Sequence, residues 1–398
     1  MELKQFEQEI QREVRDNILP FWINHTVDEA HGGFYGYINN AMETDRKADK
    51  SSVICARILW TFAKAYSMFA DPAYLTMAER AYRFLRDAFE DKENGGIYWS
   101  VDYTGRVKDS KKQIYAQAFA IYGVSEYYAV TRDPAHLAFA MELFDLLEQH
   151  TRDRAYGGYF DALAADWNPL ADTSLSQKDM NVPKTMNTNL HVLEGYTNLC
   201  RVSQDPAVES ALRDILRICA EKITDPATGH FMLYFDDQWQ SQANVTSFGH
   251  DIEGSWLMCE AAELQQDSVL RGEIETLAMK MADTVYRTGL DTQYGGLFET
   301  EKDGVLQTDG SEWWTQAEAV VGFFNAYAVT GENRYLDAVY SVWRFIQAHL
   351  VDRKNGEWFW GVSRDGTAVF DDTKVSAWKC PYHNSRMCFE ILTRLRNL

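Results

Sequence analysis

The sequence predicts an all-α fold, an (α/α)6 barrel of six helical hairpins with short β-hairpin loops at one mouth. Two observations support this prediction. One is a glycine–aromatic motif that occurs six times along the chain, and the other is a series of paired helical patterns between its copies. No linker rich in proline or serine interrupts the series, so we expect residues 1–398 to form a single domain.

The repeated motif is a glycine turn followed by alternating aromatic residues, as in GGFYG at Gly32 and GGIYW at Gly95. Such a motif is typical of a short strand or a hairpin tip. Its second residue falls at positions 33, 96, 158, 229, 296 and 356, so successive copies are 60 to 71 residues apart. This internal period indicates one repeated unit rather than several separate domains.

The intervals between the motifs hold helical patterns in pairs. One helix of a pair mixes charged and apolar residues, as in Tyr74–Phe89, whereas the other is apolar almost all round, as in Ser52–Tyr66 and Ile114–Tyr128. A helix that is apolar on every side is buried on every side. Six such helices, each covered by an amphipathic one, predict a closed double ring.

The charge balance limits the classes of partner. The chain has 39 basic and 59 acidic residues, which gives a formal net charge of −20 at pH 7. This charge repels nucleic-acid backbones and anionic membranes, so a neutral small molecule is the expected partner. None of these patterns encodes the oligomeric state, and we expect a monomer.

The first residues and the cysteines indicate a cytoplasmic protein. The opening stretch MELKQFEQEIQREVRD is charged and amphipathic, without an apolar run of signal-peptide or membrane-spanning length. The six cysteines form no C-x-x-C pair, and most of them lie inside apolar helical runs. We therefore expect reduced core thiols rather than disulfides or a zinc cluster.

The six apolar helices carry a few polar and large aromatic residues in or near their first two turns. In chain order these are Arg57; Tyr115; Asn187 and His191; His250 and Glu253; Trp313, Trp314 and Glu318; and His383 and Arg386. Parallel inner helices of a barrel begin at the same mouth. We therefore expect these side chains to converge in one pocket.

Three of these residues are histidines. His250 and Glu253 are three residues apart and share a helix face, so the carboxylate is expected to hold the imidazole tautomer and raise its basicity. His191 has Glu194 at the same spacing, and His383 lies at the corresponding place on the last inner helix. A single histidine of this kind is usually a satisfied structural residue, but three together favour a site for proton transfer.

Two other kinds of site stay open at this point. Three histidines from different helices could bind zinc, although no H-E-x-x-H motif is present. Glu253 and Glu318 could serve as the two carboxylates of a glycoside hydrolase, but the histidines would then have no task. Trp313, Trp314 and Trp378 suit a sugar ring whether the histidines or the two glutamates carry out the reaction. No G-x-S-x-G motif and no phosphate-binding glycine loop is present.

Eight stretches spread along nearly the whole chain carry a resemblance to a known family. They are ILPFW, GGFYGY, ARILWTF, YAQAFAIYGVSEYY, KTMNTNLHVLEGYTNL, SFGHDIEGSW, WWTQAEAVVGFFNAY and WKCPYHNSRMCFE, of which the last three together are highly specific. The chain resembles the cellobiose 2-epimerases of the N-acylglucosamine 2-epimerase superfamily. The (α/α)6 barrel of that superfamily agrees with the sixfold period found in the sequence.

The resemblance implies a carbohydrate epimerase (an isomerase) that opens a reducing-end glucose and inverts C2 to give mannose, without a cofactor or a metal. It implies that His250 and His383 are the acid/base pair, with Glu253 as the partner of His250. Arg57, His191, Tyr115 and Asn187 are implied to surround the open-chain sugar, with Trp314 and Trp378 stacking on it. We expect Arg57 and His191 to be catalytic as well, and Glu318 to bind the substrate. Inversion needs two proton carriers on opposite faces, and imidazole suits this task near neutral pH.

Two positions depart from the family pattern. Family members commonly read K-H-x-Y where this chain has KQIY, so Gln113 replaces a histidine. The H-N-G-R of the family is HNSR here, with Ser385 in place of glycine. Neither change removes a proton carrier. Both leave open whether the substrate is a disaccharide or a free hexose such as glucose, mannose or N-acetylglucosamine.

Overall fold

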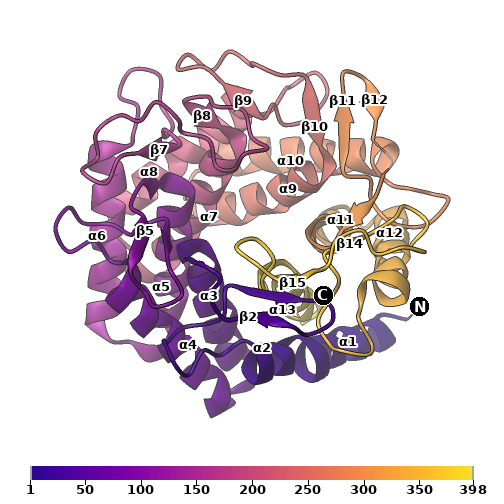
Figure 1. The fold of residues 1–398 in the computed structure, drawn as a ribbon. Coiled ribbons are helices and arrows are strands. Elements are labelled where there is room, and N and C mark those ends of the chain that lie inside the picture. Colours follow the sequence, from indigo (N-terminus) through magenta and orange to yellow (C-terminus); the bar gives the residue numbers. More distant parts are fainter. Residues whose placement is uncertain (1, 308, 397–398) are drawn as a thin grey trace.

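The computed structural model describes residues 2–307 and 309–396, and its helices form two concentric rings (Figure 1). The inner ring consists of α3 (Ser52–Phe69), α5 (Ile114–Thr131), α7 (Met186–Ser203), α9 (Phe248–Glu263), α11 (Trp313–Thr330) and α13 (Tyr382–Leu395). Each inner helix contacts the next, and α13 contacts α3, which closes the ring. The predicted (α/α)6 barrel is confirmed.

The outer ring covers the inner one helix by helix. It comprises α4 (Pro72–Phe84), α6 (Pro134–His150), α8 (Pro206–Ile218), α10 (Ser268–Thr288), α12 (Asn333–Phe345), and the N-terminal α1 (Leu3–Arg12) and α2 (Leu19–His25). In the described part of the chain, π-helical segments extend or join these helices: η1 (Glu13–Ile18), η2 (Leu85–Phe89), η3 (Cys219–Ile223) and η4 (Ile346–Leu350). Because α1 and η1 pack on α13, the two ends of the chain complete one pair of helices.

The inner helices are buried on all sides, as their composition predicts. Every residue from Ile114 to Tyr127 of α5 is buried. The helices approach so closely that a Cβ on Gly123 would lie 2.6 Å from the carbonyl oxygen of Ala56, and a Cβ on Gly195 would lie 2.7 Å from that of Ala118. Glycine therefore permits backbone contact between α3, α5 and α7.

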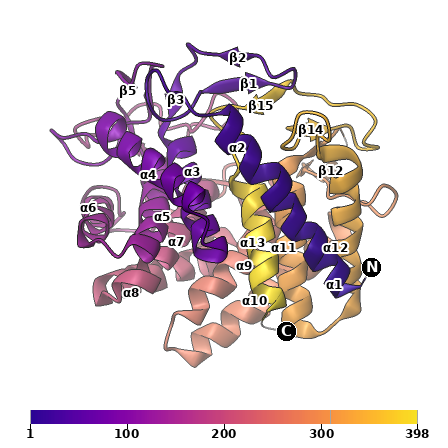
Figure 2. The ribbon, with the colours of Figure 1, turned by 90° about the horizontal axis from the view of Figure 1, so that it is seen from below.

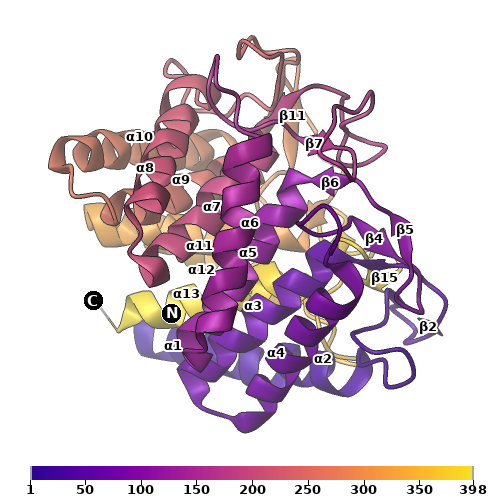
Figure 3. The ribbon, with the colours of Figure 1, turned by 90° about the vertical axis from the view of Figure 1, so that its left-hand side faces the viewer.

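Short antiparallel strands gather at one end of the barrel, opposite to the chain termini (Figures 2 and 3). They are β1 (Tyr37–Asn39), β2 (Thr44–Asp45), β3 (Lys50–Ser51), β4 (Ser100–Val101), β5 (Val107–Asp109), β6 (Lys112–Gln113), β7 (Ala162–Leu163), β8 (Lys184–Thr185), β9 (Tyr234–Phe235), β10 (Val245–Ser247), β11 (Thr300–Lys302), β12 (Val305–Leu306), β13 (Ser311–Glu312), β14 (Gly361–Val362) and β15 (Thr373–Val375). The strand that leads into an inner helix pairs with the strand that follows the matching outer helix. In the first and last repeats, Ile38 of β1 pairs with Val375 of β15.

The glycine–aromatic motifs form the tips of tight hairpins, as predicted. Gly32 and Gly33 have φ values of 78° and 62°, which favour glycine, and Phe34 then pairs with Val27 in an isolated antiparallel bridge. Buried lysine–aspartate pairs tie several of these tips to the start of an inner helix. Lys112, for example, lies two residues before the first residue of α5. Its Nζ is 2.7 Å from Asp91 Oδ2. The mouth of the barrel is therefore rigidly connected to the helix N-termini.

Within the described residues, no helix combines the length and the apolar character that a membrane span requires.

Candidate active site

A cavity of about 540 Å³ lies at the mouth where the inner helices begin. Its lining comprises Arg57, Tyr115, Asn187, His191, His250, Glu253, Trp313, Trp314, Trp378 and His383, together with Leu175, Ser176, Gln177, Lys178, Asp179, Glu312 and Trp360. The first ten are residues that the sequence singled out. The expected convergence on one pocket is therefore observed, while the chemical roles of these residues stay predictions.

Helix starts explain this convergence. Tyr115 and His383 are the second residues of α5 and α13, and His250 is the third residue of α9. Arg57 lies in the second turn of α3, whose N-cap Ser51 accepts a hydrogen bond from the backbone N–H of Val53. All six inner helices point their N-terminal ends at the cavity, which favours negative charge there.

His383 is a buried imidazole with a carboxylate partner. Its Nδ1 lies 2.8 Å from Glu318 Oε1 of α11. Burial lowers the pKa of His383 well below its ordinary value, and the charges of Arg57 and Arg386 lower it further. Because Nδ1 is engaged, Nε2 is the ring nitrogen that remains for a substrate.

His250 has a different partner from the one that the sequence predicts. Its Nδ1 lies 2.7 Å from the hydroxyl oxygen of Ser247, and its ring centroid lies 4.7 Å from that of Trp314. Glu253 does not form a hydrogen bond with His250, because its Oε1 accepts one from Arg386 instead. The predicted His250–Glu253 pair is therefore wrong. Burial lowers the pKa of His250 to about 3, with a smaller contribution from His191.

His191 keeps the partner expected from its spacing. Its Nδ1 lies 2.8 Å from Glu194 Oε2, one helical turn further along α7. Its ring packs edge-on against Tyr115, with the centroids 4.9 Å apart. His191 and Tyr115 thus form one side of the cavity wall.

Arg386 connects the carboxylates beneath the cavity. Its guanidinium donates to Glu194 on α7, Glu253 on α9 and Glu318 on α11, and the Arg386–Glu318 distance is 2.7 Å. Arg386 is fully buried and does not line the cavity. One cation from α13 therefore holds three other inner helices and orients the carboxylate partners of both His191 and His383.

Glu253 lines the cavity and keeps one carboxylate oxygen without a hydrogen-bond partner among the described residues. Arg386 binds its Oε1, while its buried Oε2 has no hydrogen-bond partner among the described residues. Burial raises the pKa of Glu253, the charge of Glu318 raises it further, and Arg386 opposes both effects. A sugar hydroxyl that donated to Oε2 would satisfy this group.

Glu318 does not contact the cavity, contrary to its predicted place among the substrate-binding residues. It is fully buried, and its carboxylate contacts His383, Arg386 and the indole N–H of Trp256 at 3.2 Å. Two carboxylates of a glycoside hydrolase must both reach the scissile bond. Glu318 lies behind His383, so it cannot serve as the second carboxylate of a glycoside hydrolase in this cavity.

Arg57 and Tyr115 form a second polar contact at the cavity wall. Arg57 Nη2 donates to the Tyr115 hydroxyl at 2.6 Å, and the guanidinium lies 4.2 Å from the ring centroid of Phe119. The Nε of Arg57 has no partner within the described part of the chain. Burial raises the pKa of Tyr115 to about 12, so its hydroxyl stays protonated. Arg57 thus places a permanent positive charge beside the cavity.

Tryptophans line much of the remaining wall. Trp314 and Trp378 lie where the sequence predicts, and Trp360 joins them from the segment before β14. The Trp314 indole N–H donates to Glu312 Oε2 at 2.8 Å, which fixes the ring beside His250. Sequence reasoning missed Glu312 and Trp360. Glu312 directly precedes Trp313, the first residue of α11. This position at the start of an inner helix could have indicated that Glu312 lies at the cavity.

No pattern in the sequence indicated the segment 175–179, which lines the outer part of the cavity. It belongs to a long connection without helix or strand between β7 and β8. Because periodic patterns locate helices and strands, they do not place such a segment.

The three-histidine zinc interpretation has no geometric support within residues 2–307 and 309–396. The ligand-type atoms that come within 4.8 Å of one another in a group of three belong to Glu253, Glu318 and His383, without His191 or His250. Arg386 already donates to both carboxylates of this group. The positive charge of the Arg386 guanidinium, in hydrogen-bond contact with both carboxylates, disfavours binding of a metal cation there.

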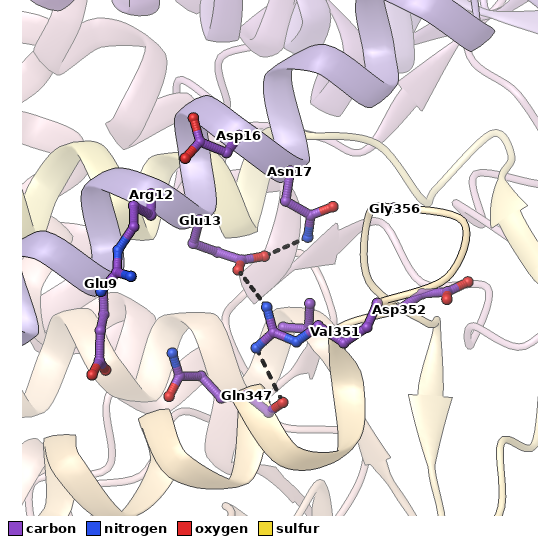
Figure 4. Close-up of a pocket in the computed structure, with 10 residues that line it drawn as sticks. Glu9, Arg12, Glu13, Asp16, Asn17, Gln347, Val351, Asp352 and Gly356 are labelled. Atoms are coloured by element: carbon purple, nitrogen blue, oxygen red, sulfur yellow. Dashed lines mark hydrogen bonds and ion pairs between the residues drawn. The ribbon is translucent and has the colours of Figure 1, made fainter.

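A second hollow, of about 580 Å³, lies on the outside of the barrel between η1 and η4 (Figure 4). Its acid Glu13 accepts hydrogen bonds from Asn17 at 2.6 Å and from the indole of Trp358 at 2.8 Å. Arg353 lies 3.6 Å from the same carboxylate. These contacts satisfy Glu13 within the protein, and the hollow contains none of the histidines, so the cavity at the mouth is the candidate active site.

Comparisons with known proteins agree with this geometry. The family model described as N-acylglucosamine 2-epimerase (GlcNAc 2-epimerase) matches residues 33–386. The cellobiose 2-epimerase of Bacteroides fragilis is 46% identical over 97% of this chain and 98% of its own length. The structure of the cellobiose 2-epimerase from Spirochaeta thermophila DSM 6192 superposes with a TM-score of 0.93 at 41% identity, and covers 99% of this chain and 98% of that one.

A D-mannose isomerase structure has the same fold, with a TM-score of 0.84 at 20% identity over 97% of this chain and 98% of that chain. The range that the family model matches, residues 33–386, includes the histidines, Arg57 and the tryptophans of the cavity. The chain therefore belongs to the N-acylglucosamine 2-epimerase family and is a carbohydrate 2-epimerase.

Proposed function

We propose that the protein inverts C2 of the reducing-end glucose of cellobiose or a related β-1,4-linked disaccharide, without a cofactor, and that His250 and His383 carry the protons. The observation that supports this most directly is that two imidazoles from different inner helices, α9 and α13, line one cavity while their Nδ1 atoms are held by the protein. Each therefore has its Nε2 for the substrate.

Inversion proceeds through the open-chain sugar. One imidazole takes the C2 proton, and the electron pair of the broken C–H bond forms the enediolate with the C1 carbonyl. The other imidazole, which must carry a proton at that moment, returns it to the opposite face of C2. The enzyme then has its proton on the first histidine, and exchange with water restores the starting state.

The partner of His383 can store the proton that this cycle needs. Burial raises the pKa of Glu318 although Arg386 opposes it, and burial lowers the pKa of His383. Adding one proton to this pair makes it electrically neutral, and a buried site favours that state. While the proton is on this pair, His250, whose partner is a serine, is the neutral base. Inversion in the other direction needs the proton on His250, so that His383 is the base.

The remaining cavity residues have separate tasks in this proposal. Arg57 and the helix N-termini stabilise the negative charge that develops on O1 and O2. Tyr115, Asn187, His191 and the free oxygen of Glu253 bind hydroxyls. Trp314 and Trp378 stack on the sugar rings.

We also propose that residues 1–398 act as one catalytic domain in a cytoplasmic monomer. Pairing of β1 with β15 and packing of α1 on α13 support the single domain. All six cysteines are free thiols, in keeping with a reducing compartment. Light scattering coupled to size-exclusion chromatography measures the mass in solution, and a value of twice 45.8 kDa or more would exclude the monomer.

Separate incubations with cellobiose, lactose, glucose and mannose, with and without EDTA, test the function. We expect a mannose-ended product from each disaccharide, and the same rate in EDTA. Conversion of the free hexoses alone would favour a monosaccharide epimerase or isomerase. Release of glucose from cellobiose without a mannose-ended product would indicate hydrolysis, and loss of activity in EDTA that zinc restores would indicate a metal site.

A further inference from the structure

Gln113 makes its side-chain contacts with a distant loop. It is the last residue of β6, directly before α5, and it is fully buried. Its Nε2 donates to the carbonyl oxygen of Ser174 at 2.9 Å and of Thr173 at 3.4 Å. Its Oε1 has no partner among the described residues, so the donor half of the amide makes the contact.

The loop that Gln113 holds covers the outer part of the cavity. We call residues 171–182 the roof loop. Its two ends are joined, because Thr173 Oγ1 donates to the carbonyl oxygen of Val182 at 2.7 Å. Residues 175–179 line the cavity. Gln113 thus binds the roof loop at the two residues directly before it reaches the substrate cavity.

A second contact holds the other side of the roof loop. The Tyr234 hydroxyl, on β9, donates to Asp179 Oδ1 at 3.2 Å, and Ser176 Oγ donates to Asp179 Oδ2 at 2.6 Å. The loop is therefore tied to β6, at the start of α5, through Gln113 and to β9 through Tyr234. Between these ties, the exposed side chains of Gln177 and Lys178 reach the cavity.

We propose that Gln113 is a positioning residue that holds the roof loop over the cavity and thereby sets how tightly the enzyme binds its sugar. The inference rests on the proposed function, because it takes the cavity as the sugar site. A primary amide has two N–H donors, whereas a neutral imidazole has one. Glutamine therefore suits two adjacent carbonyl acceptors, and its contact does not depend on pH.

The test replaces Gln113 by leucine, which has a similar volume but no donor. We expect KM for the best disaccharide to rise about 5- to 10-fold, the effect of losing roughly one net hydrogen bond, with kcat within about twofold of the parent. Hydrogen exchange should become faster in residues 171–182 and stay unchanged in α5. Gln113→His, which keeps one donor, should restore most of the binding.

Three further variants make the result specific. Gln113→Asn keeps a polar amide, but the side chain is too short to reach the roof loop. This variant replaces Gln113→Leu if the leucine variant does not fold, and it should show the same rise in KM and in loop exchange. Tyr234→Phe should also raise KM and loop exchange. Asn168→Ala is the matched control, because Asn168 is exposed in the same β7–β8 connection and bonds to Asp166 rather than to the roof loop.

The outcomes separate the two proposals. Faster loop exchange in Gln113→Leu, combined with no sugar turnover by the parent enzyme, would retain the anchor and reject the epimerase function. Normal turnover by the parent with unchanged loop exchange in the variant would reject the anchor. A fall in kcat at constant KM would also overturn the positioning role.

Discussion

The Nδ1 atom of His383 lies 2.8 Å from Oε1 of Glu318, and that same oxygen accepts a hydrogen bond from Arg386 at 2.7 Å. Glu318 thus lies between an imidazole that reaches the cavity and a guanidinium that does not. Through Arg386 the contact extends to Glu194, the partner of His191. The carboxylates that orient two of the three cavity histidines are therefore held by one cation.

Replacing Glu318 by glutamine should reduce kcat by about 10²- to 10⁴-fold, the range for losing an acid/base group or its carboxylate partner. Glutamine keeps the shape but neither stores a proton nor matches both His383 and Arg386. The measurement is the epimerisation rate at saturating disaccharide. Glu260→Gln is the control, because Glu260 is ion-paired with Arg201 at the far end of α9. A Glu318→Gln variant with unchanged kcat would remove the proton-storing role.

Arg57→Ala should cost about 10²- to 10³-fold in kcat/KM, as expected for the loss of one electrostatic donor at a developing anion. The effect on stability should be smaller, because Arg57 contacts Tyr115 and aromatic faces rather than a buried carboxylate. Thermal unfolding and steady-state kinetics on the same sample separate the two effects. A large drop in melting temperature with normal turnover of the folded fraction would indicate a structural role.

The double ring could be predicted from the sequence because two periodic signals agree. The glycine–aromatic motif repeats six times, and the all-round apolar helices between its copies have no other place than an interior. The positions of Arg57, Tyr115 and His383 follow, since parallel inner helices begin at one mouth. Local spacing also predicted the His191–Glu194 contact correctly.

The same spacing gave the wrong partner for His250, and the reason is tertiary. Glu253 lies one turn from His250, but Arg386, 133 residues away in the chain, takes its carboxylate. A buried guanidinium binds a carboxylate more strongly than a neutral imidazole does. Glu318 was misplaced for a similar reason, because its position in the second turn of α11 sets it behind His383 rather than at the cavity. The roof loop has no periodic pattern and could not be placed at all.

His230→Asn should make stability less favourable at low pH than at high pH, relative to the parent. His230 Nδ1 lies 2.6 Å from Asp251 Oδ2. Burial lowers the pKa of His230, but the hydrogen bond and charge of Asp251 outweigh it and leave the pKa raised. The pair therefore stabilises the fold below the pKa of an unfolded histidine, and this contribution is lost as pH rises through the folded pKa.

Urea unfolding at about pH 6 and about pH 9 measures this effect, and the parent–variant difference should shrink by about 1 kcal/mol or less at the higher pH. Burial also raises the pKa of Asp251, which opposes the gain. The other buried acids titrate in both the parent and the variant. The difference between the two unfolding free energies therefore isolates the contribution of His230. A difference that does not change with pH would show that His230 stays neutral.

The exchange of deuterium at C2 gives the sharpest test of the two histidines. His250→Asn and His383→Asn should each lower the epimerisation rate by about 10²- to 10⁴-fold or more, because each removes one of the two proton carriers. The remaining imidazole can still take the C2 proton from one epimer and return a solvent-derived proton to the same face. In D2O, each variant should therefore label one epimer at C2 without inverting it.

The two variants should label opposite epimers, because His250 and His383 are proposed to serve opposite faces. By family resemblance we assign His383 to the C2 proton of the glucose form and His250 to that of the mannose form. His250→Asn should then label the glucose form, and His383→Asn should label the mannose form, as measured by proton NMR of the recovered sugars. Labelling of the same epimer by both variants would place the two imidazoles on one face, so that another cavity residue must serve the other. Near-normal epimerisation by either variant would exclude the two-histidine mechanism altogether.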